Sequence, residues 1–158
     1  MSRPSRESDP GSILATSRTF FVASRSAQGR SILQSERMAM LFIEVLRSYV
    51  TAKRFVVDEF TVMPNHVHLL MTVKEDMSIE KAVQLIKGNF SYRARKEFGL
   101  EHEIWQRGFS EDRVLDRESF LQHKLYIDLN AVRAGLAKNA DAYPYCSAYF
   151  RKLKASKS

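Results

Sequence analysis

The chain has 158 residues, a length that suits one domain with a sizeable core but not two. Hydrophobic residues make up 44% of it, and no run approaches the roughly 18 consecutive apolar residues of a membrane-spanning helix, so we expect a globular protein without a membrane segment. Lysine and arginine outnumber aspartate and glutamate by 25 to 18, and the net charge of +7 favours a polyanionic partner, nucleic acid ahead of a membrane surface.

The single cysteine indicates the redox setting of the protein, and the composition of the two ends indicates the boundaries of the domain. Cys146 alone cannot form an intramolecular disulfide, and with only four histidines it argues against a zinc finger, so we expect a reducing, cytoplasmic setting. We expect residues 1–16 to form a disordered tail without a secretory signal, residues 17–150 to form one domain, and residues 151–158 to form a basic tail. The charge alone leaves a second interpretation, in which it only improves solubility.

The first half of the domain is predicted to contain three strands and one helix. Residues 19–26, rich in aromatic and β-branched side chains, indicate a strand. Apolar residues at helical spacing indicate an amphipathic helix over 36–53. Residues 54–63 and 66–73 indicate two strands joined by a short turn at Pro64 and Asn65, so we expect them to pair antiparallel.

The second half is predicted to contain two helices and one further strand. A helix is expected to begin after Ser78, a suitable N-cap, and to stop at Gly99. Residues 104–115 indicate a strand or extended segment, and Asp116 caps a helix running to about Ala134. The order β-α-β-β-α-β-α predicts an α+β fold: a ferredoxin-like, split-βαβ antiparallel sheet with helices on one face, followed by a C-terminal helix.

Two histidines lie two positions apart in the segment MPNHVHLLM, residues 63–71. Because alternate residues of a strand point to the same side, His66 and His68 share one face, and the apolar residues between them share the face toward the helices. Two imidazoles on one face can bind one divalent cation if a third ligand comes from elsewhere. The spacing alone leaves a second interpretation, in which both histidines are solvent-facing residues of the sheet.

The last predicted helix carries a polar stripe beside an apolar one. We expect the buried stripe to consist of Leu121, Leu125, Leu129, Val132 and Leu136. His123, Tyr126, Asn130 and Arg133 form the second stripe. This set matches tyrosine-dependent DNA cleavage, with Tyr126 as nucleophile, Asn130 as cation ligand and Arg133 as phosphate contact. His123 either orients or deprotonates the phenol or is unrelated to it, and in the structural alternative Tyr126 only borders the core.

The sequence resembles the single-tyrosine HUH transposases, specifically their REP-associated branch. The matching blocks, in the family's order over about residues 17–150, are VMPNHVHLLM, IWQRGF, YIDLNAVRAGL and YPYCSAY. The resemblance implies that His66 and His68 bind Mg²⁺ or Mn²⁺ and that Tyr126 is the nucleophile; from spacing and family position we infer Asn130 as the third ligand. It also implies a bacterial enzyme that cleaves and rejoins single-stranded, hairpin-containing DNA at REP-like repeats through a 5′-phosphotyrosine intermediate.

Basic and aromatic residues provide further candidates for DNA contacts. We expect such contacts from Lys87, Arg93, Arg95, Trp105, Gln106, Arg107 and Arg133. The alternatives are a solvated helix face for the basic residues and core packing for Trp105.

Three positions depart from the family pattern. Ala131 replaces a proline, which removes the cause of a helix kink and can change the aim of Asn130. Cys146 replaces a serine, and Phe21 stands where many members carry a histidine that can contact phosphate. Because both histidines and Tyr126 are retained, we expect an active enzyme. We also expect a monomer, since the tyrosine helix can reach its own sheet after the loop at 99–116. The alternatives are a catalytically silent DNA-hairpin-binding protein, a metal-dependent phosphodiesterase that uses water, and a helix-swapped dimer.

Overall fold

The described part of the chain folds into one four-stranded sheet and four helices. The computed structural model describes residues 17–157, so the tail expected at 1–16 lies outside the described residues. The elements are β1 (Arg18–Arg25), α1 (Glu36–Thr51), β2 (Val56–Met63), β3 (His66–Val73), α2 (Ile79–Phe98), β4 (Ser110–Val114), α3 (Arg117–Arg133) and α4 (Ser147–Ser156), with 3₁₀ turns η3 (Ala27–Gly29) and η4 (Ala140–Ala142). The strands are antiparallel in the order β2-β3-β1-β4, which confirms the ferredoxin-like, split-βαβ arrangement.

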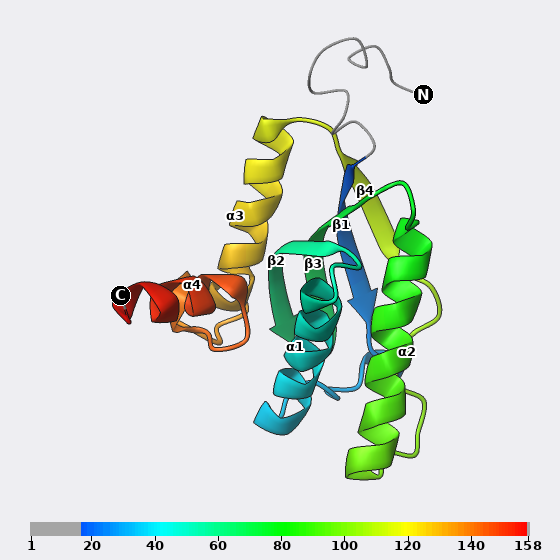
Figure 1. The fold of residues 1–158 in the computed structure, drawn as a ribbon. Coiled ribbons are helices and arrows are strands. Elements are labelled where there is room, and N and C mark those ends of the chain that lie inside the picture. The colour runs from blue at the N-terminus through cyan, green and yellow to red at the C-terminus, as the bar shows by residue number, and fades with distance from the viewer. Residues whose placement is uncertain (1–16, 158) are drawn as a thin grey trace.

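The two faces of the sheet carry different helices. Figure 1 shows α1 and α2 in front of the sheet, with α3 and α4 toward the left. The main core lies between the sheet and the first two helices, whereas Ile127 of α3 packs with Leu70 and Val114 on the opposite face. The face that bears the histidines is therefore covered by α3.

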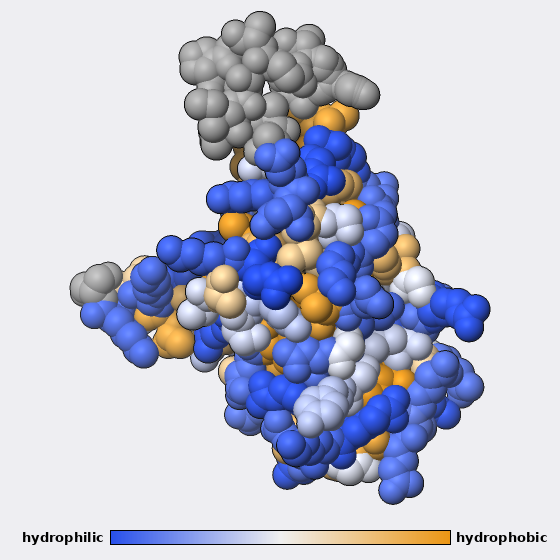
Figure 2. Space-filling model, turned by 45° about the vertical axis from the view of Figure 1, so that its right-hand side comes forward, coloured by the Kyte–Doolittle hydropathy of each residue, from blue (hydrophilic) through white to orange (hydrophobic). Residues whose placement is uncertain are grey.

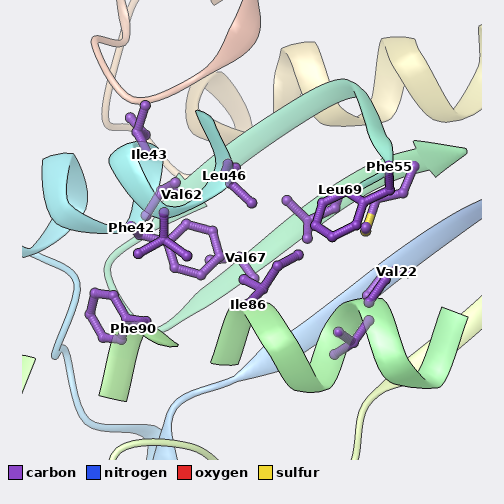
Figure 3. Packing of buried hydrophobic residues seen from close by; sticks show 14 of the residues in the cluster. Val22, Phe42, Ile43, Leu46, Phe55, Val62, Val67, Leu69, Ile86 and Phe90 are labelled. Atoms are coloured by element: carbon purple, nitrogen blue, oxygen red, sulfur yellow. The ribbon is translucent and has the colours of Figure 1, made fainter. Parts of the chain in front are cut away.

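Alternation along β3 determines which side chains enter the main core. Val67 and Leu69 point toward α1 and α2 and are buried against aromatic residues of those helices, including Phe42 and Phe90 (Figure 3). The rings of Phe42 and Phe90 meet edge to face with their centroids 5.7 Å apart, a favourable geometry for aromatic pairs. This packing fixes the strand register and so directs His66 and His68 to the other face.

The helix ends follow the signals in the sequence. The side chains of Ser35, Ser78 and Asp116 accept hydrogen bonds from the third backbone amide beyond each, an N-cap arrangement worth about 1 kcal/mol per helix. Gly99 ends α2 with φ 69°, a left-handed conformation that glycine adopts without a steric penalty. These caps explain why the predicted helix boundaries agree closely with those of the structure.

The predicted buried stripe of α3 is wrong. Leu121, Leu125 and Leu136 are exposed, and Leu129 and Val132 are only half-buried. The buried residues of α3 are instead Ile127, Asn130 and Ala131. The helix is rotated so that its second, polar stripe faces the sheet, because that stripe borders the histidines.

Two further segments differ from the expectation. The fourth strand is shorter than the segment 104–115, since regular pairing with β1 covers only Ser110–Val114. Residues 151–156 of the expected basic tail belong to α4, a helix that the sequence analysis did not predict.

None of the helices within residues 17–157 is long and apolar enough to cross a membrane. The face seen in Figure 2 is mostly hydrophilic, with apolar residues scattered between charged ones.

Candidate active site

A pocket of about 390 Å³ lies where the ends of β1, β2 and β3 meet α3. Its lining residues are Ala23, Arg25, Met63, His66, His68, Tyr126, Asn130, Arg133 and Ala134. The two histidines, the tyrosine, the asparagine and Arg133 predicted from the sequence are thus brought together in one pocket.

The tyrosine ring lies next to the histidine pair. The ring centroids of His66 and His68 are 4.9 Å apart, and that of Tyr126 is 5.3 Å from His68 in an edge-to-face arrangement. Phe21 of β1 stacks on His68 with a centroid distance of 5.4 Å and meets the edge of Tyr126 at 5.9 Å. Three separate elements therefore position the phenol and the imidazoles.

Arg133 holds Tyr126 from its own helix. Its Nη2 donates a 2.8 Å hydrogen bond to the Tyr126 carbonyl, and its guanidinium carbon lies 4.5 Å from the centroid of the phenol ring. Tyr126 is nevertheless 44% exposed. The ring is held in place while nearly half of the residue stays open to solvent.

The environment of both histidines favours the neutral imidazole. Burial, followed by the positive charge of Arg25, lowers the pKa of His66, and a hydrogen bond to Asn130 partly offsets this. The pKa of His68 falls to about 4, mainly through burial and then through His66, Arg25 and Arg133. Neutral imidazole is the form that binds a metal ion.

Hydrogen bonds also orient the imidazole nitrogens. The side-chain oxygen of Asn65 lies 2.8 Å from Nδ1 of His66. Because that oxygen only accepts, Nδ1 carries the hydrogen and Nε2 keeps its lone pair. His68 is 8% exposed, and its buried Nδ1 finds no hydrogen-bond partner among the described residues. A buried imidazole nitrogen without a partner calls for a ligand.

The donor set of the pocket fits a divalent cation. Besides the imidazole nitrogens of the two histidines, the pocket is lined by the buried side chain of Asn130, which offers an amide oxygen. Within residues 17–157 there is no cluster of three or more His, Cys, Asp and Glu, so a third protein ligand must be of another type, such as this amide oxygen. Two nitrogens and one oxygen suit Mn²⁺ better than Mg²⁺, which prefers oxygen ligands.

Arg25 is a pocket residue that the sequence analysis missed. It ends β1, is exposed, and pairs with His66 in the strand register. Together with Arg133 it places two guanidinium groups around the histidines and Tyr126. Guanidinium groups bind phosphate oxygens in a fork geometry, so this pair suits a DNA backbone.

The segment containing Gln106 and Arg107 lies beside the pocket. The backbone amide of Gln106 donates to the carbonyl of Arg25 at 2.9 Å, and Trp105 pairs with Ser26. Gln106 and Arg107 are exposed there.

Other candidates for DNA contacts have partners inside the protein. Trp105 packs against aromatic core residues and donates to the carbonyl of Lys87 at 3.2 Å, and Lys87 in turn donates to the carbonyls of Gln106 and Gly108. These contacts support the segment that carries Gln106. The DNA-binding roles of Trp105 and Lys87 remain predictions.

The two arginines of α2 differ in environment. Arg93 forms ion pairs with Glu44 and Glu97 at 3.1 and 2.6 Å, whereas Arg95 is exposed in the last turn of the helix. Since α2 covers the face of the sheet away from the histidines, any contact by these residues would involve DNA outside the pocket.

The three departures from the family pattern have visible consequences. α3 is unbroken through Ala131, which packs with Met63 and Cys146 in a small cluster. Asn130 still faces His66. Phe21 contacts His123 at 4.6 Å, and Nδ1 of His123 donates to the carbonyl of Ser119 in its own helix. A role of His123 in orienting or deprotonating the phenol stays a prediction.

The fold and the pocket define an α+β domain in which a helix tyrosine faces a pair of histidines on an antiparallel sheet. The sequence model of the family described as "Transposase IS200 like" matches residues 21–130, more than half of the chain. The protein therefore belongs to the IS200-like transposase family, as the sequence motifs predicted.

Individual relatives and structures agree with this assignment. A candidate REP-associated tyrosine transposase of Haemophilus influenzae is 31% identical over 104 residues, which cover 60% of this chain and 58% of that protein. The REP-associated tyrosine transposase of Escherichia coli is 28% identical over 131 residues, or 80% of this chain and 74% of that protein.

Two solved structures share the fold. A REP-associated tyrosine transposase bound to a REP hairpin superposes with a TM-score of 0.69 at 23% identity, covering 98% of this chain and 87% of that one. A candidate transposase from Deinococcus radiodurans gives a TM-score of 0.55 at 20% identity, covering 69% of this chain and 87% of that one.

Proposed function

We propose that this protein is a metal-dependent nuclease and strand transferase that cleaves and rejoins single-stranded DNA through a phosphotyrosine at Tyr126. The observation that carries the proposal is the position of the Tyr126 ring, 5.3 Å from that of His68, in a pocket that also holds His66 and Asn130. A tyrosine that only faced solvent would not be expected to lie next to two histidines and a buried asparagine.

The reaction divides into two transesterifications. The phenolic oxygen of Tyr126 attacks the scissile phosphorus, the bond from phosphorus to the 3′ oxygen breaks, and that oxygen takes up a proton to become a free 3′-hydroxyl. The DNA on the other side of the break remains attached to Tyr126 through its 5′-phosphate. In the second step a 3′-hydroxyl attacks the same phosphorus and releases the tyrosine, so rejoining requires no external energy source.

The pocket residues have distinct roles in this scheme. His66, His68 and Asn130 would hold the divalent cation, Mn²⁺ or Mg²⁺, which when bound supplies positive charge to a non-bridging phosphate oxygen. Arg25 and Arg133 bind neighbouring phosphate oxygens and orient the strand. Arg133 also holds the Tyr126 ring, so it links phosphate binding to the position of the nucleophile.

We infer that the substrate is single-stranded DNA containing a hairpin of the REP type. A relative of the same fold was solved bound to a REP hairpin, and the net charge of +7 of this chain suits a polyanion. Gln106 and Arg107, beside the pocket, are placed to contact the strand next to the hairpin.

Covalent capture tests the proposal. The protein is incubated with a labelled hairpin-bearing single strand and Mn²⁺, and the products are separated by denaturing electrophoresis. We expect a shifted protein–DNA adduct that is absent with EDTA. Binding without an adduct under any metal would identify a silent hairpin-binding protein instead, and cleavage without an adduct would identify a phosphodiesterase that uses water.

Removing Arg25 should slow cleavage without weakening hairpin binding. In Arg25→Ala one of the two guanidinium groups around the scissile phosphate is lost, so we expect the single-turnover rate to fall by about ten- to a hundredfold. The matched control is Arg54→Ala, which removes an exposed arginine near the opposite end of the sheet. Equal rates for Arg25→Ala and wild type would show that Arg25 does not contact the reacting phosphate.

Binding of the hairpin should depend steeply on salt. Because each neutralised phosphate releases counterions, we expect the logarithm of the affinity to fall linearly with the logarithm of salt concentration, with a slope of several units. Titration by fluorescence anisotropy at several salt concentrations measures this slope. A flat response would refute binding through basic side chains.

A further inference from the structure

A charged cluster outside the pocket joins three elements. Nη1 of Arg151 in α4 lies 2.5 Å from Oε1 of Glu59 in β2, and its Nη2 lies 3.4 Å from Oδ1 of Asp128 in α3. Glu59 is buried and also accepts a 2.7 Å hydrogen bond from the Ser147 hydroxyl. One guanidinium group therefore bridges the sheet and the tyrosine helix.

The α4 side of this bridge is firmly attached to the sheet. The segment before α4 runs along β2, with the amide of Val62 donating to the Tyr145 carbonyl at 2.8 Å and the Tyr143 hydroxyl donating to the Val62 carbonyl at 2.6 Å. The Ser147 hydroxyl accepts from the amide of Phe60 at 3.0 Å. Arg151 therefore extends toward α3 from a helix that is attached to the sheet.

The tyrosine helix has few other attachments. Its buried side chains are Ile127, Asn130 and Ala131, while Leu121 and Leu125 are exposed. So small an apolar contact resists a rotation of the helix poorly, and rotation moves Tyr126 relative to His68. Asp128 lies two residues beyond Tyr126, so an ion pair at this position opposes such a rotation directly.

A buried carboxylate such as Glu59 is costly unless it is paired, and an apolar residue of similar size often stabilises a core as well or better. The bridge from Glu59 through Arg151 to Asp128 is therefore better explained by its effect on the orientation of α3 than by a gain in stability. Arg151 can bridge two carboxylates because its guanidinium presents separate nitrogens in a planar fork, which lysine cannot do.

We propose that Arg151 is a positioning residue for the reaction: by joining Glu59 to Asp128 it fixes the rotation of α3 and holds Tyr126 opposite the histidine pair. This inference rests on the proposed function for its catalytic consequence. The pocket and the bridge are formed within one chain.

Single-turnover kinetics at saturating hairpin DNA test the catalytic consequence. We expect Arg151→Ala to form the covalent adduct at least about tenfold more slowly than wild type, with hairpin affinity unchanged. Arg151→Lys neutralises Glu59 but cannot reach both carboxylates, so we expect an intermediate rate. The matched control is Lys152→Ala, the next residue of α4, which is 67% exposed and lies 3.7 Å from Asp141; we expect the wild-type rate.

A second variant covers the case in which Arg151→Ala fails to fold. Asp128→Asn breaks the link from Arg151 to α3 and weakens the 2.9 Å ion pair of Asp128 with Lys124 in the same helix, and it leaves the pair between Glu59 and Arg151 intact. Lys124→Ala removes only the pair within α3 and is the control for that loss. We expect Asp128→Asn to keep a thermal midpoint near that of wild type and to form the adduct more slowly. A wild-type rate in a folded Asp128→Asn variant would overturn the proposal, as would a loss of hairpin affinity at an unchanged saturated rate in Arg151→Ala.

Hydrogen exchange tests whether Arg151 holds α3, independently of whether the protein cleaves DNA. In the free protein we expect the amides of Tyr126 to Arg133 to exchange faster in Arg151→Ala and Asp128→Asn than in wild type, and unchanged in Lys152→Ala. If wild type forms no adduct, the proposed function fails while this measurement still decides whether Arg151 holds α3. Unchanged exchange of α3 in both variants would refute the bridge.

Discussion

Replacing Tyr126 with phenylalanine is expected to lower the rate of covalent DNA capture by at least about a thousandfold, because the attacking oxygen is lost. The phenylalanine ring keeps the contacts with His68, Phe21 and the Arg133 guanidinium. Hairpin binding should therefore stay near the wild-type value. The rate of adduct formation is measured on denaturing gels, and the hairpin affinity is measured by fluorescence anisotropy.

The control for this variant is Tyr92→Phe, which changes an exposed tyrosine of α2. We expect it to form the adduct at the wild-type rate. If Tyr126→Phe still cleaved the strand but left no adduct, a water-dependent phosphodiesterase would explain the pocket better than a transposase. If it still formed an adduct, another residue would be the nucleophile.

Removing either histidine is expected to weaken Mn²⁺ binding and cleavage by at least about a hundredfold, since each supplies one of two imidazole ligands. His66→Ala is the milder change for folding, because that side chain is only half-buried. Titration calorimetry with Mn²⁺ and single-turnover cleavage measure the two effects. Hairpin affinity without metal should not change.

His102→Ala serves as the control, since His102 is exposed in the loop between α2 and β4. It should bind Mn²⁺ and cleave as wild type does. Should His66→Ala and His68→Ala lose hairpin binding as strongly as cleavage, the histidines would be structural residues. Unchanged Mn²⁺ affinity in both variants would exclude them as ligands.

Local signals were sufficient to predict most of the fold. The turn at Pro64 and Asn65 and the alternation in 66–73 gave the pairing of β2 with β3 and the face of the histidines, because both features are set by residues close in sequence. Ser78 and Gly99 likewise marked the ends of α2.

The orientation of α3 could not be predicted from its apolar pattern. Its leucines show regular helical spacing, yet Leu121 and Leu125 are exposed. The helix is oriented by the groups that must border the pocket, so polar Asn130 is buried where an apolar residue would normally be. Hydrophobic periodicity predicts only which face of a helix is apolar. The face of α3 that packs on the sheet also carries polar groups of the pocket, so periodicity could not identify it.

α4 was missed for a related reason. The helix has only ten residues, and besides the packing of Phe150 on Phe60 its attachment to the sheet depends on polar contacts of Ser147 and Arg151 with Glu59. Such contacts join residues far apart in sequence and leave no periodic signal. The basic residues of this segment suggested a solvated tail instead.

In the candidate site too, residues could be predicted from spacing within one element but not from contacts between elements. His66, His68, Tyr126 and Asn130 followed from spacing within one strand and one helix, supported by family motifs. Arg25 did not, because it meets His66 only through the pairing of β1 with β3. The signal that could have identified it is its position at the end of the strand expected to lie next to the histidine strand.

The most direct test of the central claim is the location and polarity of the DNA–protein bond. The hairpin substrate carries different labels at its two ends, and the adduct is digested with trypsin and analysed by mass spectrometry. We predict that the strand 3′ to the break remains bound through its 5′-phosphate to Tyr126, in the peptide of residues 125–133, and that the other fragment is released with a free 3′-hydroxyl. An adduct on a different residue, or retention of the 5′-labelled fragment, would contradict the account.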